Sequence, residues 1–174
     1  MAQPILYMLL GYPGAGKTTT AKILEKLTRA YRLTSDDERL KMFPDPSFSQ
    51  EEHARLYQKL DDETERLLAS GQSVIYDANL NRYTHRKEKY KICQKTNAIP
   101  VLIWLNTGRD ISETRATDKT REKLWPINET AEAMFNRIAN LIEPPNENEH
   151  PIILEGSNLS PEIVQSALET RNSI

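Results

Sequence analysis

Eight residues near the N-terminus, Gly11–Thr18, constrain the fold of this chain more than any other segment. They read Gly-Tyr-Pro-Gly-Ala-Gly-Lys-Thr and match the pattern Gly, four residues, Gly-Lys-Ser/Thr without a gap. An apolar run at Ile5–Leu10 precedes them, and Ala21, Leu24 and Leu27 follow at helical spacing. Strand, glycine-rich loop and helix in this order are the context that a phosphate-binding loop requires. The sequence therefore predicts a loop that holds phosphate groups.

Each part of this loop has an expected task. Glycines permit backbone angles at which successive N–H groups point inward at phosphate oxygens, and the start of the following helix adds its positive dipole end. Lys17 should reach the β- and γ-phosphates of a nucleotide, and the Thr18 hydroxyl should ligate Mg²⁺. We therefore predict a nucleotide-binding set of Gly11, Tyr12, Pro13, Gly14, Ala15, Gly16, Lys17, Thr18 and Thr19.

The composition of the chain limits the classes of protein to which it can belong. The 174 residues are 38% hydrophobic and 28% charged, which is typical of one globular domain. The net charge is −2, so no global basic footprint for nucleic acid is present, although a local basic groove is compatible with it. Cys93 is the single cysteine, which excludes an internal disulfide and a cysteine-cluster metal site. The N-terminus resembles neither a signal peptide nor a membrane span, so we expect a cytoplasmic protein without a membrane partner.

The order of predicted elements indicates an α/β fold. We expect strands over Pro4–Leu10, Tyr31–Thr34, Ser73–Asp77, Pro100–Leu105 and Ile152–Leu154. Helical patterns lie between them, over about 17–30, 49–70, 82–95, 109–123 and 128–141, and a last helix begins after Ser160. Alternation of this kind predicts a three-layer P-loop NTPase fold, with a five-stranded parallel sheet, helices on both faces and a helical lid. We expect one kinase-like domain over 1–174, with the lid at about 107–127.

Polar residues follow the second predicted strand. In sheets of this type ligands gather at the carboxyl ends of the strands, so Asp36 should face the γ-phosphate and accept a proton from an incoming hydroxyl. Arg39 falls on the same face if a helical turn starts there, and it would hold a phosphate or polar group of the acceptor. The alternative is that Asp36 only caps a helix and Arg39 is solvated.

Polar residues also follow the third predicted strand. Asp77 ends that strand, where phosphate-loop enzymes keep the Asp that supports Mg²⁺; the alternative is an ordinary turn aspartate. Asn79, Arg82 and Arg86 come next and are candidates for binding the acceptor. For the two arginines, which are four residues apart, a solvated basic helix face is the alternative.

The segment 109–123 is very polar and has almost no apolar face. A mobile helix with arginines can close over the γ-phosphate and exclude water, and we choose Arg115 and Arg121 for this catalytic role. The alternative is a charged surface helix. Gly156, after the last strand, is a candidate wall for the nucleotide base.

Three segments together resemble a known family. Gly11–Thr18, Ser35-Asp36-Asp37-Glu38-Arg39 and Asp77-Ala78-Asn79-Leu80-Asn81 are similar to motifs of the small phosphate-loop kinases related to the kinase domain of bacteriophage polynucleotide kinase. Zeta-toxin-type and chloramphenicol-phosphotransferase-type kinases are more distant relatives. The resemblance covers nearly the whole chain.

The resemblance implies roles for individual residues. The family's Asp-Asp-x-Arg motif supplies a general base and an arginine for the acceptor-side phosphate, which correspond to Asp36 and Arg39. Two features depart from the family pattern: Ala78 stands where the phage enzyme has Thr, and the lid is about one residue longer. Lys119 and Arg121 therefore compete for the place of the second lid arginine.

These observations predict a kinase that uses ATP and Mg²⁺ to phosphorylate a hydroxyl group. A polynucleotide 5′-hydroxyl and a hydroxyl of a small metabolite or nucleotide sugar are the two candidate acceptors. A nucleotide-dependent switch or regulatory ATPase is the alternative of another class, although the chain lacks an Asn-Lys-x-Asp motif for guanine and an Asp-x-x-Gly switch after the third strand. An inactive scaffold is a third alternative.

Overall fold

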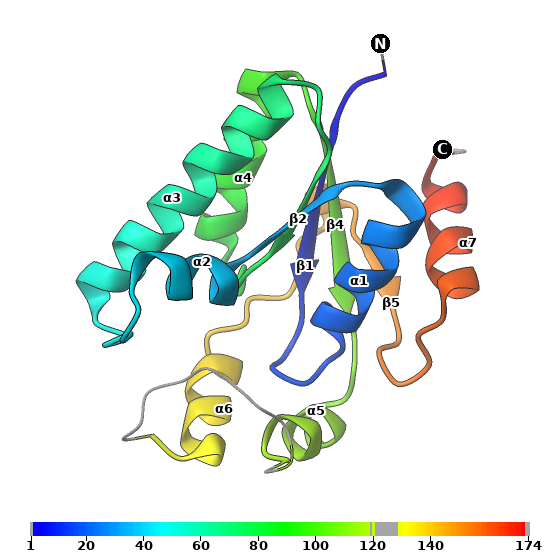
Figure 1. Ribbon diagram of the computed structural model, residues 1–174. Coiled ribbons are helices and arrows are strands. Elements are labelled where there is room, and N and C mark those ends of the chain that lie inside the picture. The colour runs from blue at the N-terminus through cyan, green and yellow to red at the C-terminus, as the bar shows by residue number, and fades with distance from the viewer. Residues whose placement is uncertain (1, 119, 121–128, 173–174) are drawn as a thin grey trace.

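The computed structural model describes residues 2–118, 120 and 129–172. Five parallel strands form one sheet in the order β2-β3-β1-β4-β5, as Figure 1 shows. The strands are β1 (Ile5–Leu10), β2 (Tyr31–Thr34), β3 (Val74–Asp77), β4 (Ile99–Leu105) and β5 (Ile152–Leu154). The predicted five-stranded parallel sheet is confirmed.

Helices connect the strands along the described chain. They are α1 (Lys17–Thr28), α2 (Ser35–Met42), α3 (Gln50–Ala69), α4 (Tyr83–Thr96), α5 (Arg109–Ala116), α6 (Ala131–Ala139), a short 3₁₀ helix (Glu147–Glu149) and α7 (Pro161–Asn172). No helix in these described ranges is both long and apolar enough to span a membrane.

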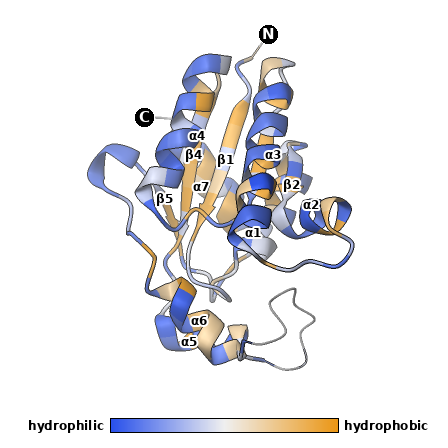
Figure 2. Cartoon of the chain, turned by 90° about the vertical axis from the view of Figure 1, so that its left-hand side faces the viewer, coloured by the Kyte–Doolittle hydropathy of each residue, from blue (hydrophilic) through white to orange (hydrophobic). Residues whose placement is uncertain are grey.

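The sheet is buried on both faces, as a parallel sheet with continuous apolar strands should be. On one face, Leu56 and Leu60 of α3 pack against β1 and β3 with Cys93 of α4. On the other face, Leu24 of α1 and Val164 of α7 pack against β1 and β4. Figures 1 and 2 show the two helical layers with their apolar sides turned to the sheet. The predicted three layers are confirmed.

The carboxyl ends of β2 and β3 lie together. In β2 and β3 the register pairs Thr34 with Asp77, so the residues that follow these strands begin at one level. Helix α2 starts directly at Ser35, because the Thr34 side chain accepts a hydrogen bond from Asp37 N at 3.1 Å and caps the helix. The helical turn on which the role of Arg39 depended is therefore present.

Two helices lie apart from the layers, beyond the carboxyl ends of the strands (Figure 1). These are α5, which lies within the first part of the predicted lid, and α6, which follows the predicted lid. Helix α5 ends at Ala116, so it is shorter than the predicted helix over 109–123. The cap expected at Asn128 lies outside the described residues, and the N-cap of α6 is Thr130, whose side chain accepts from Ala133 N.

Candidate active site

The phosphate loop lies between β1 and α1 and is held by close backbone contacts. Gly14 has φ +81°, and a Cβ atom on it would lie 2.2 Å from the carbonyl oxygen of Ser112 in α5. Only glycine suits both the left-handed backbone and this approach. The loop is therefore packed directly against the helix on which the predicted lid begins.

The segment after β5 supports the loop from another direction. A Cβ atom on Gly156 would lie 1.9 Å from the carbonyl oxygen of Ala15, and the buried Thr107 hydroxyl, after β4, donates to the same oxygen at 2.8 Å. Gly156 thus touches the phosphate loop itself. The role proposed for it from the sequence, as a wall for the base, stays a prediction.

Lys17 is bound to its own loop. Its Nζ donates to Gly11 O at 2.7 Å and to Tyr12 O at 2.8 Å. Burial lowers the pKa of Lys17 to about 8, and the negative charge of Asp77 opposes this shift. The ammonium is therefore held at the loop by carbonyl groups that a phosphate can replace, and it is close to losing its proton at neutral pH.

Asp36 and Asp77 lie near each other at the ends of β2 and β3. Burial raises the pKa of Asp36 above its ordinary value, the charge of Asp77 raises it further, and Arg39 opposes both. Arg32 of β2 binds Asp77 with Nε at 3.0 Å and Nη2 at 2.6 Å, both to Oδ2. A raised pKa suits a group that must take a proton near neutral pH.

Arg39 is buried and paired, rather than solvated. Its guanidinium forms an ion pair with Glu52 of α3 and lies 4.8 Å from the centre of the Phe48 ring. The Glu52 carboxylate also accepts from Ser47 N at 2.6 Å and Ser47 Oγ at 2.8 Å. Although burial opposes it, these bonds together lower the pKa of Glu52. Arg39 is thus fixed beside the site by an acid that its sequence motif does not contain.

The candidate acceptor residues after β3 separate into two groups. Asn79 is positioned by its backbone N–H, which donates to the Tyr57 hydroxyl at 3.1 Å, and Arg82 is exposed. Arg86, in contrast, is 0% exposed and forms an ion pair with Glu149. Its placement does not fit the acceptor contact that we predicted, because its donors are directed at the protein.

A groove of about 820 Å³ opens beside Arg39, Asn79 and Arg82. One wall comes from α3, where the His53 and Tyr57 rings lie 4.4 Å apart between centres. The other wall comes from α6 and its flanks, including Met134, Glu129, Arg137, Ile138 and Leu141. The groove is the largest of the described pockets and is large enough for a ligand of nucleotide or sugar size.

One predicted lid residue can be placed. Arg115 is on α5, and its Nη1 donates to Gly156 O at 3.0 Å, so it joins the lid side to the loop that touches Ala15. Arg121 and the alternative, Lys119, lie outside the described residues. The catalytic role of each arginine therefore stays a prediction.

The loop suits a triphosphate with Mg²⁺. Gly16 is the N-cap of α1 and offers no side-chain hydrogen bond there, so the first N–H groups of the helix are directed at the loop and available to phosphate oxygens. The Thr18 side chain is exposed and, with Asp77, would hold the hard oxygen-preferring cation. The described residues contain no group of three His, Cys, Asp or Glu side chains that could bind a metal.

Comparison with known families agrees with this geometry. The model of the family AAA_33, described as an AAA domain, matches residues 6–165. The chain belongs to this family. No curated protein sequence matches it.

Solved kinase structures share the fold. The APS kinase CysC of Mycobacterium tuberculosis, in complex with AMPPNP and APS, is 20% identical, with a TM-score of 0.70 over 99% of both chains. A gluconokinase from Sinorhizobium meliloti 1021 is 14% identical, with a TM-score of 0.66 over 97% of this chain and 92% of that one. A chain of the Pnkp1/Rnl/Hen1 RNA repair complex is 22% identical, with a TM-score of 0.66 over 81% of this chain and 45% of its own length. At these identities the similarity establishes the P-loop kinase fold alone.

Sequence reasoning missed three residues that shape the site. Arg32 pairs with Asp77, Glu52 pairs with Arg39, and Tyr57 accepts from the backbone of Asn79. A charged residue inside the short strand β2 was the one available signal, because an arginine in a buried strand requires a partner. The positions of Glu52 and Tyr57 depend on how α3 crosses the sheet, which no local pattern encodes.

Proposed function

We propose that this protein is an ATP-dependent kinase that transfers the γ-phosphoryl group to a hydroxyl acceptor. The observation that carries the proposal is the position of Asp77 within electrostatic reach of both Lys17 and Asp36. Arg39, whose charge also acts on Asp36, lines a groove of about 820 Å³. Phosphoryl transfer needs positioned phosphates, charge compensation and a group that accepts the proton of the attacking hydroxyl. Lys17, Asp36 and Asp77 are of the types that supply those functions.

Each residue has one task in this proposal. The loop N–H groups and Lys17 bind the β- and γ-phosphates, while Thr18 and Asp77 hold Mg²⁺, which when bound offsets phosphate charge. Asp36 receives the hydroxyl proton as the new bond to phosphorus forms. Burial raises its pKa, which strengthens it as a base. Arg115 and Arg121 would close on the transferring group from the lid.

The acceptor site is the groove. Arg39, Asn79 and Arg82 line this groove, and the charge of Arg39 also acts on Asp36. The His53 and Tyr57 rings, whose planes are tilted by 32°, offer an aromatic surface, and burial together with nearby Arg39 lowers the pKa of His53. A neutral ring surface beside arginines suits a polynucleotide end, whose bases stack and whose phosphates pair with cations. We propose a polynucleotide 5′-hydroxyl as the first acceptor to test.

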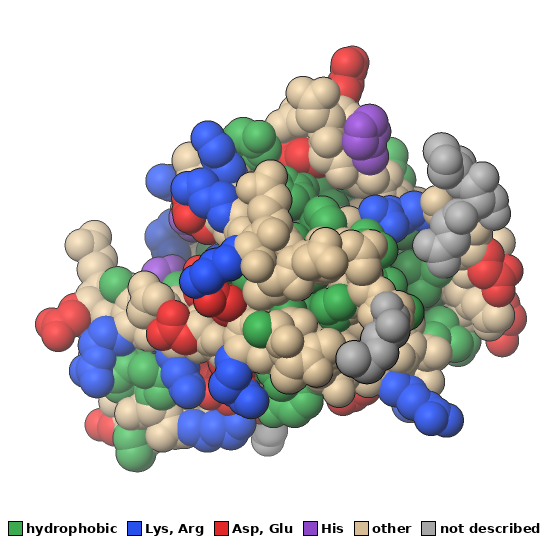
Figure 3. Space-filling view, turned by 90° about the horizontal axis from the view of Figure 1, so that it is seen from above, with side chains coloured by type: hydrophobic (Ala, Val, Ile, Leu, Met, Phe, Trp, Pro, Cys, Tyr) green, Lys and Arg blue, Asp and Glu red, His purple; other side chains and the backbone are tan. Residues whose placement is uncertain are grey.

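A small-molecule hydroxyl is the alternative acceptor. The groove volume also fits a sugar or a nucleotide sugar, and the net charge of −2 gives no general attraction to nucleic acid. The face at the amino ends of the strands has Lys and Arg side chains mixed with Asp and Glu (Figure 3). With this net charge, we propose that a nucleic-acid acceptor is bound at its end, in the groove.

The deciding experiment is transfer of labelled γ-phosphate from ATP to 5′-hydroxyl DNA and RNA oligonucleotides, beside a pool of hydroxyl metabolites. Asp36→Asn is the control, because it preserves the size of the side chain and removes the base. If an oligonucleotide is labelled by the wild-type protein but not by the variant, the proposal with a nucleic-acid acceptor is supported. If only the metabolite pool is labelled, the acceptor is a small molecule. No label anywhere, with ATP still bound, refutes the kinase and leaves the regulatory ATPase.

A further inference from the structure

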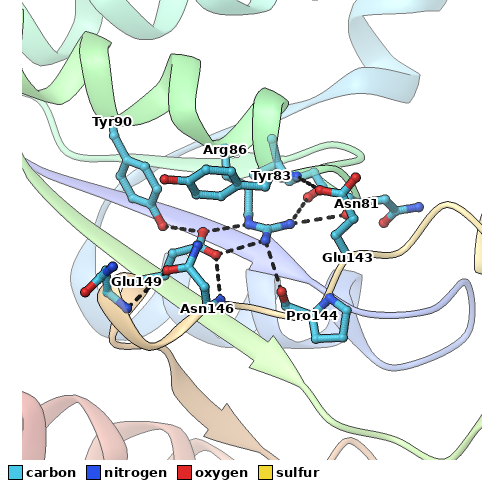
Figure 4. Close-up of polar contacts among 10 residues, drawn as sticks. Asn81, Tyr83, Arg86, Tyr90, Glu143, Pro144, Asn146 and Glu149 are labelled. Atoms are coloured by element: carbon cyan, nitrogen blue, oxygen red, sulfur yellow. Dashed lines mark hydrogen bonds and ion pairs between the residues drawn. The ribbon is translucent and has the colours of Figure 1, made fainter.

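The Arg86 guanidinium is the largest fully buried polar group of the described chain, with 0% of the residue exposed. It forms a two-pronged ion pair with Glu149, from Nε to Oε1 at 2.7 Å and from Nη2 to Oε2 at 2.9 Å, as Figure 4 shows. The two residues are 63 positions apart in the chain. Arg86 is in the first turn of α4, whereas Glu149 ends the short 3₁₀ helix before β5.

The remaining donors of Arg86 bind backbone carbonyls. Its Nη1 donates to Leu80 O at 3.1 Å and Asn81 O at 3.2 Å, and its Nη2 reaches Pro144 O at 3.5 Å. One planar group thus joins the loop after β3 to the segment after α6. This fits the rigid fork of a guanidinium, which a lysine cannot reproduce.

Glu149 is equally well satisfied. Besides Arg86, its carboxylate accepts from the Tyr90 hydroxyl at 2.9 Å and from Asn146 N at 3.0 Å. Burial opposes the charged form, but these partners lower the pKa of Glu149 below its ordinary value. The pair is therefore charged and fully bonded at neutral pH.

Three further bonds join the same two segments. Glu143 N donates to Asn81 O at 2.8 Å, and Asn81 Nδ2 donates to Ile138 O in α6 at 3.3 Å. Tyr83 N donates to the Glu143 carboxylate at 2.6 Å. Figure 4 shows the Glu143 side chain beside the Arg86 network. The end of α6 is thereby fastened to the loop after β3.

Both fastened segments line the groove. The loop contributes Asn79, Asn81 and Arg82 to one side, and α6 contributes Met134, Arg137 and Ile138 to the other. The two segments meet at Asn81 and Arg86. Arg86 itself is not among the residues that line the groove.

We propose that Arg86 and Glu149 are a positioning pair that sets the width of the acceptor groove by joining the loop after β3 to the segment after α6. The pair does not touch the acceptor. A buried ion pair contributes little net stability compared with well-packed apolar residues, but here it binds three backbone carbonyls and a carboxylate to one planar group. The expected effect on catalysis rests on the proposed function. The structural joint between the two segments does not depend on that function.

The test compares Arg86→Lys with Lys89→Met. Lys89 is a matched control because it is 3% exposed, lies on the same helix and pairs with Asp61 of α3 at 2.6 Å, away from the joint. In Arg86→Lys we expect kcat/KM for the acceptor to fall about tenfold to a hundredfold, the effect of misplacing a reacting group by about 1 Å. ATP affinity should be unchanged in both variants, and the acceptor KM should be unchanged in Lys89→Met.

Amide hydrogen exchange supplies a readout that needs no activity. We expect faster exchange at 80–83 and 138–149 in Arg86→Lys than in Lys89→Met. If the wild-type protein phosphorylates no acceptor, the proposed function fails, and the exchange data still decide whether the joint exists. Equal exchange in the two variants, or parallel losses of ATP and acceptor binding, would overturn the positioning role. Tyr90→Phe, which removes one bond to Glu149, replaces Arg86→Lys if that variant does not fold.

Discussion

Raising the pH above 8 should weaken nucleotide binding through one residue. Burial lowers the pKa of Lys17 to about 8 in the nucleotide-free protein. Phosphate binds the charged ammonium, so its pKa rises in the complex. Nucleotide therefore binds the molecules in which Lys17 is protonated, and the fraction of such molecules decreases as the pH rises through 8.

The size of the effect follows from this pKa. Between pH 7.5 and pH 9 the protonated fraction falls from about 0.76 to about 0.09, so the Kd for nucleotide should increase about eightfold. The nucleotide phosphates contribute little in this range, because the second pKa of a phosphate ester is about 6. Cys93 does not interfere, since burial raises its pKa to about 12.

Isothermal titration with a non-hydrolysable ATP analogue measures both the affinity and the protons taken up. At pH 8.5, repeated in buffers of different ionisation enthalpy, we expect uptake of about 0.8 proton per nucleotide bound. Lys17→Arg is the matched control, because a guanidinium stays charged throughout this range. Its binding should be nearly independent of pH. An equal pH dependence in the variant, or no proton uptake by the wild-type protein, would refute the reasoning.

Three further perturbations test the site. Asp36→Asn should reduce kcat by about 10²–10⁴-fold without a change in ATP affinity, and undiminished transfer in steady-state kinetics would contradict this. Because burial raises the Asp36 pKa, the acidic limb of the wild-type pH profile should lie above pH 3.8, the ordinary pKa of Asp. Gly156→Ala should destabilise the fold by about 1–3 kcal/mol, because its Cβ would lie 1.9 Å from the carbonyl oxygen of Ala15; an unchanged thermal midpoint would disagree. Glu52→Ala should cost about 3–5 kcal/mol in urea unfolding, because it leaves Arg39 charged and buried without its acid; a loss below about 1 kcal/mol would mean that Arg39 finds another partner.

Local sequence patterns predict the central elements of the fold. The apolar run of β1, the glycine loop and the helix of α1 are contiguous in the chain, so their order and spacing already specify a phosphate loop. Asp77 is at the end of β3 as expected. Helix α2 begins within one residue of β2 because Thr34 caps it, which places Asp36 on the first turn.

Local sequence patterns do not predict ion pairs between residues that are distant in the sequence. The pattern Ser49-x-x-Glu52 is typical of a capping box, and the Ser49 hydroxyl does accept from Glu52 N. The Glu52 side chain, however, pairs with Arg39 of α2, which this pattern does not indicate. Arg86 has the spacing of an exposed helix residue, yet its partner Glu149 is supplied by a segment 63 positions later. Such pairings depend on the packing of whole elements, which the local pattern does not contain.

The close contacts around Ala15 divide the site into a fixed half and an adaptable half. Behind the phosphate loop, the neighbours are backbone atoms, with Gly14 against Ser112 and Gly156 against Ala15, so almost any added atom is rejected. The groove walls are instead side chains of α3 and α6, which can be exchanged without moving a backbone. If the groove holds the acceptor as proposed, substitutions at His53 or Met134 would change which acceptor is bound while nucleotide binding is retained, which makes the groove the natural starting point for engineering.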